Sequence, residues 1–101
     1  PSCFSPFKSV PLSLNAYDEW VSERERLRGI EILSDPATIR ALQEIGVSEK
    51  WRCLETGAGG GSIAEWLCQT VGAAGQVVAA DLEVKFLKAL DYPNLDVWEF
   101  N

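Results

Sequence analysis

Four glycines crowd into five positions in the segment Glu55-Thr56-Gly57-Ala58-Gly59-Gly60-Gly61. A short apolar run, Arg52-Cys53-Leu54-Glu55, leads into this cluster, and apolar residues at helical spacing follow it: Ile63, Trp66, Leu67 and Val71. The glycines therefore stand where a strand ends and a helix begins. Glycine lets the backbone turn tightly and approach a ligand closely, and the exposed amides at the helix start favour an anionic ligand group. This context predicts a ligand-binding loop and not merely a tight turn.

Strands and helices alternate after the cluster. The pattern predicts a helix from Ser62 to Val71, an apolar strand from Gln76 to Asp81, a short helix over about 84–90 and a third strand over 95–100. Such alternation with short connections is typical of a parallel sheet with right-handed crossovers. We predict an α/β fold, a partial Rossmann-like doubly wound parallel sheet of about three strands in the order 3-2-1. The strand 52–55 then lies at the sheet edge.

The region before the first strand predicts an irregular arm over residues 1–14 and two helices. The first helix is capped by Asn15 and runs to about Leu33, with a buried stripe at Tyr17, Trp20, Leu27 and Ile30. The second helix has Asp35 as its cap and Pro36 at its first position, and Gly46 ends it. On the charged first helix, Glu23, Glu25 and Glu31 are expected to be solvated. We expect residues 15–101 to form one domain.

The acid that precedes the glycines distinguishes between ligands. Dinucleotide-binding loops carry glycine at the first, third and sixth positions, and the sixth position counted from Gly57 is Ser62. Glu55, at the last position of its strand, would repel a pyrophosphate. It is suited to accept hydrogen bonds from an ammonium group, directly or through water. S-adenosylmethionine (SAM) has such a group and no phosphate, so its chemistry fits better than that of NAD.

The segment Leu54-Glu55-Thr56-Gly57-Ala58-Gly59-Gly60-Gly61-Ser62 resembles the first motif of class I SAM-dependent methyltransferases, an acid followed by spaced glycines. Val77-Val78-Ala79-Ala80-Asp81 resembles their second strand, and 94–101 is similar to their third. The resemblance covers residues 51–101 and implies a SAM cofactor. It implies these cofactor-binding residues: Glu55, Gly57, Ala58, Gly59, Gly61, Asp81, Leu82 and Asn101.

Individual roles also follow from the resemblance. It implies that Asp81 binds the two ribose hydroxyls, that Leu82 flanks the adenine and that Asn101 contacts the adenine amine, where many relatives have Asp. The acid at the end of the second strand serves dinucleotide folds in the same way, so Asp81 alone does not discriminate between the two families. No catalytic base is identified, and the methyl acceptor, a small molecule if the chain is active, is not specified by the sequence.

Composition excludes several classes of function. The chain has 9 basic and 15 acidic residues and a net charge of −6, which disfavours nucleic acid and anionic membranes as partners. It has no histidine, and its three cysteines match no zinc or disulfide spacing, so no metal site is expected. No apolar stretch is long enough to cross a bilayer and no signal peptide is apparent, which predicts a cytoplasmic protein.

An edge strand beside the ligand loop leaves backbone groups unpaired. We therefore expect a homo-oligomer or another partner that covers this edge, in a truncated or split methyltransferase domain. Two alternatives stay open at this point. One is a non-catalytic module that binds SAM or a nucleotide and dimerises, or serves purely for interaction. The other is a fragment of an NAD-binding oxidoreductase, which Glu55 and Ser62 disfavour.

Overall fold

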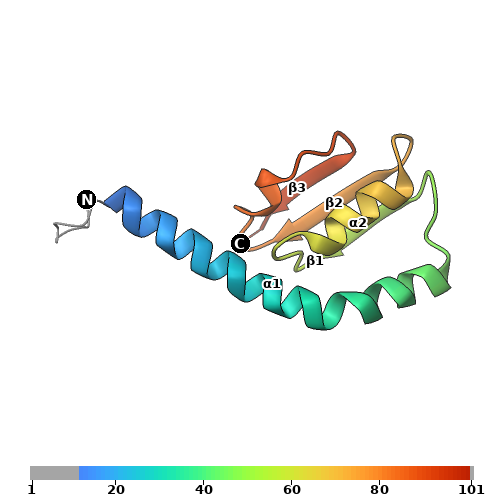
Figure 1. The fold of residues 1–101 in the computed structure, drawn as a ribbon. Helices are drawn as coiled ribbons and strands as arrows, with labels where there is room; N and C mark the ends of the chain where they lie inside the picture. Colours follow the sequence, from blue (N-terminus) through green and yellow to red (C-terminus); the bar gives the residue numbers. More distant parts are fainter. Residues whose placement is uncertain (1–11, 101) are drawn as a thin grey trace.

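The computed structural model describes residues 12–100, and their order is a long helix followed by a three-stranded α/β unit (Figure 1). The elements are α1 (Leu12–Ile45), β1 (Arg52–Thr56), α2 (Ser62–Val71), β2 (Gln76–Asp81), the 3-10 helix η2 (Leu87–Ala89) and β3 (Leu95–Glu99). The arm expected over 1–14 lies outside the described residues as far as position 11, and 12–14 belong to α1.

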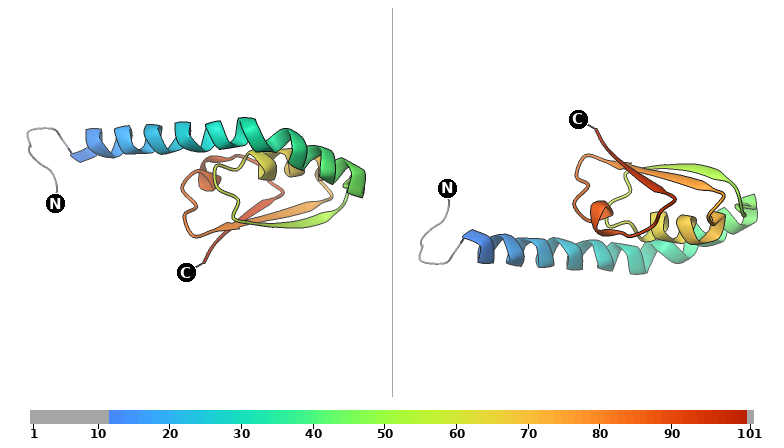
Figure 2. Two further views of the ribbon diagram at one scale, coloured as in Figure 1. Left: turned by 90° about the horizontal axis from the view of Figure 1, so that it is seen from below. Right: turned by 90° about the horizontal axis from the view of Figure 1, so that it is seen from above.

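The three strands form one parallel sheet in the order β1-β2-β3, which is the predicted 3-2-1 order read from the other edge. Glu55 of β1 is in register with Ala79 of β2, and Ala79 is in register with Val97 of β3. Both helices lie on one side of the sheet (Figure 2). The Rossmann-like α/β class predicted from the sequence is confirmed.

The core lies between α2 and the covered face of the sheet. Ala64, Leu67, Cys68 and Val71 of α2 are buried there, and Val77 and Ala79 of β2 are fully buried beneath them. The buried Asn94 side chain fixes the end of α2, because its Nδ2 donates hydrogen bonds to the carbonyls of Cys68 (3.0 Å) and Gly72 (2.9 Å). These carbonyls belong to the helix terminus, where no intrahelical donor is available.

The two helices expected before the first strand are joined into the single helix α1, with Pro36 in its interior. Proline lacks the N–H that would bond to the carbonyl of Ile32, and such a gap bends a helix without necessarily ending it. The hydroxyls of Ser34 and Thr38 bond back to carbonyls four residues earlier, at 2.8 and 3.2 Å, which also favours a bend. α1 changes direction near its middle and curves around the sheet unit (Figure 1).

The inward face of α1 differs from the one expected from the sequence. Half-buried residues recur at three- to four-residue spacing along the helix: Leu27, Glu31, Asp35, Ile39 and Leu42. The stripe expected from the sequence is therefore wrong in part, since Tyr17 and Ile30 are exposed and Leu27 alone of the four is half-buried. Glu31, expected to be solvated, lies on the inward face.

The segment after β2 is less helical than predicted. Instead of a helix over 84–90, the structure has a turn and the three-residue η2. Val84, Phe86 and Leu87 are all buried, and this spacing does not place three residues on one face of an α-helix. Packing of the segment against the core therefore overrides its helical propensity.

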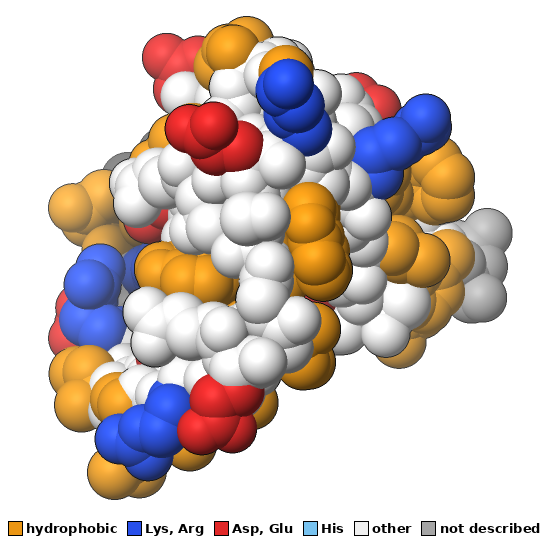
Figure 3. Space-filling model, turned by 90° about the vertical axis from the view of Figure 1, so that its right-hand side faces the viewer, with side chains coloured by type: hydrophobic (Ala, Val, Ile, Leu, Met, Phe, Trp, Pro, Cys, Tyr) orange, Lys and Arg blue, Asp and Glu red, His pale blue; other side chains and the backbone are white. Residues whose placement is uncertain are grey.

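Within residues 12–100, one face of the sheet lacks a covering layer, and both outer strands, β1 and β3, have no strand paired along their outer edge. β1 is an edge strand, and Leu54 of β1 and Trp98 of β3 are 63% and 58% exposed on the face away from the helices. At the end where the strands begin, basic, acidic and apolar side chains are intermingled and no continuous basic surface forms (Figure 3). No helix within residues 12–100 is both long and apolar enough to cross a bilayer.

Candidate functional site

The glycine loop, residues 57–61, connects β1 to α2 at the carboxyl end of the sheet. Gly57, Gly59 and Gly61 have positive φ angles of 70°, 57° and 93°, a conformation that side chains with a Cβ rarely adopt. The N–H groups of Gly57 and Ala58 donate to the carbonyl of Ala80, at 2.8 and 3.1 Å. These bonds hold the loop against the end of β2, so its shape is set by backbone geometry.

Glu55 stands directly before this loop on the covered face of β1. Its side chain is half-buried, and its Oε1 is buried without a hydrogen-bond partner. Burial raises the pKa of Glu55 from its ordinary value of 4.5 to about 7, with further contributions from the charges of Asp35 and Asp81. A carboxylate in this state gains from a cation beside it, because a positive charge offsets both the desolvation and the repulsion.

A cavity of about 270 Å³ lies between the glycine loop and the bend of α1. From the loop side it is lined by Glu55, Gly57, Ala58, Gly59, Gly60, Ser62 and Ile63. From α1 it is lined by Leu27, Ile30, Glu31, Ser34, Asp35 and Thr38. Every ionisable side chain in this lining is acidic, so the cavity is suited to a ligand with a positively charged group and unsuited to a phosphate.

Asp81, at the end of β2, is bound to the backbone around it. Its Oδ2 accepts a hydrogen bond from the N–H of Gly59 at 2.7 Å, and its Oδ1 accepts from Leu82 at 2.6 Å and, more weakly, from Glu83 at 3.4 Å. It lines a smaller cavity of about 140 Å³ together with Leu27, Gly59 and Phe86, among others. A carboxylate has about four acceptor positions, so Asp81 retains capacity for a ligand hydroxyl.

The structure brings together most of the residues singled out from the sequence. Glu55, Gly57, Ala58 and Gly59 line the larger cavity, and Gly61 begins α2 beside it. Asp81 contacts the same loop, because its Oδ2 accepts a hydrogen bond from the N–H of Gly59. The side chain of Leu82 is 62% exposed and lines neither of these two cavities. Asn101 lies outside the described residues.

The wall contributed by α1 was missed by the sequence analysis. Asp35 was interpreted as a helix cap and Glu31 as a solvated residue, but both line the cavity with Glu55. A signal was present in the spacing of Leu27, Glu31, Asp35 and Ile39, which share one face of a continuous helix. The Asp35-Pro36 pair, typical of a helix start, concealed that continuity. Within residues 12–100, no group of three or more His, Cys, Asp or Glu side chains is arranged to hold a metal ion.

Comparison with known proteins finds that the fold of this chain is similar to that of a methyltransferase. No protein-family model and no curated protein sequence matches the chain. Among solved structures, the chain is similar to that of a SAM-dependent methyltransferase from Aquifex aeolicus, with 26% sequence identity and a TM-score of 0.56. The match covers 73% of this chain and 46% of the other, so this chain spans less than half the length of that enzyme.

Proposed function

We propose that this chain binds SAM in the cavity between the glycine loop and α1, as the cofactor-binding portion of a SAM-dependent methyltransferase. The observation that carries the proposal is the buried, unpartnered Oε1 of Glu55 beside a glycine bend in an acid-lined cavity. The similarity to a SAM-dependent methyltransferase supports the same class.

The charges of the cavity fit SAM better than NAD. SAM carries an ammonium group and a sulfonium, whereas NAD carries a pyrophosphate. The lining holds Glu31, Asp35 and Glu55 and no basic side chain. An isolated buried charge is costly, and a ligand of opposite sign offsets that cost. The site therefore favours the cationic ligand.

The proposed roles of Glu55 and the glycine loop rest on their positions, and those of Asp81, Leu82 and Asn101 rest on the resemblance to the methyltransferase motifs. Glu55 accepts hydrogen bonds from the ligand ammonium through Oε1. The glycine loop, in which Gly57 and Gly59 lack side chains, lets the amino-acid part of the ligand approach the backbone closely. Asp81 accepts from the ribose hydroxyls, Leu82 flanks the adenine and Asn101 contacts the adenine amine. The exposed side chain of Leu82 is free to pack on a ring.

When bound, SAM supplies an activated methyl group on its sulfonium. The contribution of this chain is to hold and orient the donor, because most of the chemical activation belongs to the cofactor. Methyl transfer requires an acceptor site as well. The acceptor is a small molecule in this proposal, and no residue of the chain is assigned as a base.

A second candidate function is a non-catalytic SAM-binding module that associates through its sheet. The free edge of β1 and the exposed Leu54 and Trp98 favour it. Open strand edges pair readily with a further strand, and the apolar face gains by being covered. Under either function, we expect a second copy of the chain or another partner along β1.

Isothermal titration calorimetry with SAM, S-adenosylhomocysteine and NAD tests the proposal. The expected result is binding of the first two ligands, which share the ammonium group, and no binding of NAD. Glu55→Gln should abolish binding, and Glu44→Gln, an exposed acid of α1 outside the cavity, should leave it unchanged. Binding of NAD in preference to SAM would overturn the proposal. Incubation with labelled SAM and a panel of small-molecule acceptors then separates the enzyme from the binding module.

A further inference from the structure

Gly60 differs from the other glycines of the loop. Gly57, Gly59 and Gly61 have positive φ angles, whereas Gly60 has an ordinary backbone conformation that any residue adopts. Its lack of a side chain is needed for another reason. A Cβ at position 60 would collide with Oε2 of Glu31 and lie 2.9 Å from Nη1 of Arg24. Gly60 therefore provides room for two side chains of α1.

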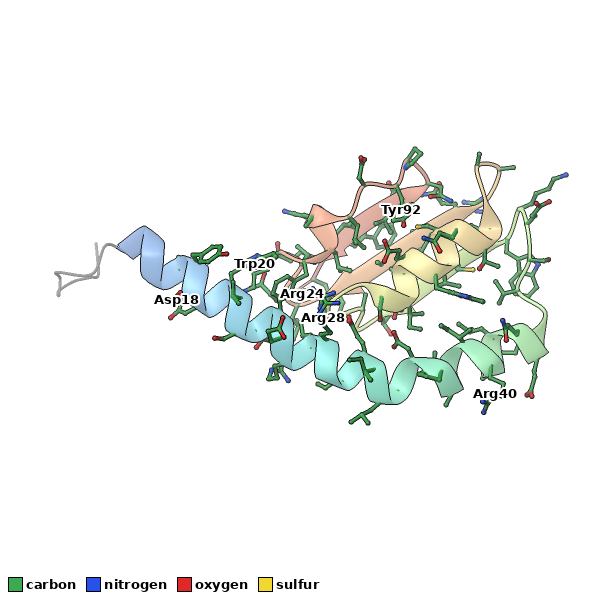
Figure 4. The ribbon with its side chains drawn as sticks, viewed as in Figure 1. Asp18, Trp20, Arg24, Arg28, Arg40 and Tyr92 are labelled. Carbon is green, nitrogen blue, oxygen red and sulfur yellow. The ribbon has the colours of Figure 1, made fainter. Side chains whose placement is uncertain are left out.

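Those two side chains form an ion pair across two turns of α1. Nη1 and Nη2 of Arg24 both lie 3.4 Å from Oε1 of Glu31, and the two side chains are only 20% and 16% exposed. The guanidinium of Arg24 also lies 5.6 Å from the ring centre of Phe86, which packs edge-on against Trp20. Arg24 and Trp20 point from α1 towards the end of the sheet (Figure 4). Arg24 thus contacts both Glu31 and Phe86, and it positions Oε1 of Glu31.

The second oxygen of Glu31 has no partner. Among the side-chain nitrogen and oxygen atoms of residues 16–100, two are buried without a hydrogen bond, Oε2 of Glu31 and Oε1 of Glu55. Both residues line the same cavity, one from α1 and one from β1. Unsatisfied buried polar atoms are rare in folded proteins because each costs about 1–3 kcal/mol. Two such atoms on residues that line one cavity are suited to accept hydrogen bonds from a ligand with several N–H donors.

We propose that Glu31 is a second recognition residue for the ammonium group at the amino-acid end of the ligand, with Arg24 as its positioning residue and Gly60 as the space in which it lies. The inference rests on the proposed SAM site and adds to it a specificity element supplied by α1. The ligand ammonium then contacts carboxylates on both sides of the cavity. Ligands that lack the amino-acid end lose this contact.

Two ligands separate this role from a structural one. S-adenosylhomocysteine carries the amino-acid end on an uncharged thioether, and 5′-methylthioadenosine has the same nucleoside and an uncharged thioether without the amino-acid end. We expect Glu31→Gln to weaken S-adenosylhomocysteine binding at least tenfold in calorimetry and to leave the affinity for methylthioadenosine within twofold. Gly60→Ala should reproduce this pattern, because the new Cβ displaces the carboxylate. Glu25→Gln, on the exposed side of the same helix, serves as the matched control and should bind both ligands normally.

The possible outcomes distinguish the role of Glu31 from the proposed SAM site itself. Unchanged S-adenosylhomocysteine affinity in Glu31→Gln, or an equal loss of S-adenosylhomocysteine and methylthioadenosine binding, overturns the role of Glu31 and leaves the proposed SAM site standing. Failure of the unmodified chain to bind SAM overturns the proposed function itself. If Glu31→Gln loses the native circular dichroism spectrum, the experiment uses Glu31→Asp instead. The aspartate keeps a negative charge that can pair with Arg24, but its shorter side chain withdraws the second carboxylate oxygen from Gly60. The same ligand-selective loss is expected.

Discussion

Replacing Glu55 by glutamine should make the free protein more stable while abolishing SAM binding. In the folded chain the ionised Glu55 is penalised by burial and by the nearby charges of Asp35 and Asp81, which raise its pKa from 4.5 to about 7. A group that binds its proton more tightly when folded destabilises the folded state wherever it is ionised. Stability is therefore lost as the pH rises from about 4.5 through 7, and glutamine removes this loss.

The size of the gain follows from the pKa. At about 1.4 kcal/mol for each pKa unit, an increase from 4.5 to about 7 has an upper limit of about 3.5 kcal/mol. The side chain is half-buried, so solvent screens part of this penalty, and we expect Glu55→Gln to raise the free energy of unfolding by about 2 kcal/mol at pH 8. At pH 4, where Glu55 is protonated in the folded chain and largely so in the unfolded chain, the gain should vanish.

Urea denaturation followed by circular dichroism at pH 4 and pH 8 measures this difference, and calorimetry with SAM measures binding. Glu44→Gln is the control, because Glu44 is exposed and lines no cavity described above. It should change neither quantity. Loss of stability in Glu55→Gln at pH 8, or SAM affinity equal to that of the unmodified chain, would refute the reasoning.

Three further results are expected. As the pH falls from 7 to 5, the SAM affinity should fall by up to tenfold for each pH unit, and protons should be released on binding, because a cation needs the ionised Glu55. Calorimetry in buffers of different ionisation enthalpy measures both the affinity and the proton release. A SAM affinity that does not change with pH would contradict the role of Glu55. Asn94→Ala should lower the free energy of unfolding by about 2 kcal/mol in urea titrations, because two carbonyls at the end of α2 lose their donor; a change below about 0.5 kcal/mol would show that the buried amide contributes little. Asp81→Ala should cost about 1–2 kcal/mol in the same assay through the lost bond to Gly59 and should also weaken SAM binding, whereas loss of stability alone would restrict Asp81 to a structural role.

The α/β unit was predictable because its signals are local. The glycines end β1 and begin α2, and the bounds predicted for α2 and β2, Ser62–Val71 and Gln76–Asp81, are those observed. An apolar run and an amphipathic period of this length are decided by neighbours in the chain. The strand order followed from the alternation of elements, since right-handed crossovers leave few topologies.

The cavity wall was not predictable in the same way. Asp35 and Pro36 form a local pattern typical of a helix start, and packing of α1 along the sheet unit overrides it. Glu31 became a cavity residue only because Gly60, distant in sequence, leaves space for its carboxylate. Such a contact depends on the tertiary fold, and the helical spacing that places Glu31 and Asp35 on one face of α1 does not by itself identify it. Half of the candidate site, the loop side, was thus found from sequence and the other half required the structure.

Chemical-shift mapping with SAM tests the central claim most directly, because it reports where the ligand lies as well as whether it binds. In nitrogen–proton correlation spectra of the labelled chain, addition of SAM should shift the backbone amide signals of Gly57, Gly59 and Gly60 together with those of Glu31 and Asp35 on α1. The signals of the turn 72–75, at the opposite end of the sheet, should stay in place. Saturating SAM that leaves the glycine-loop signals unmoved, or that shifts the 72–75 turn instead, would contradict the account.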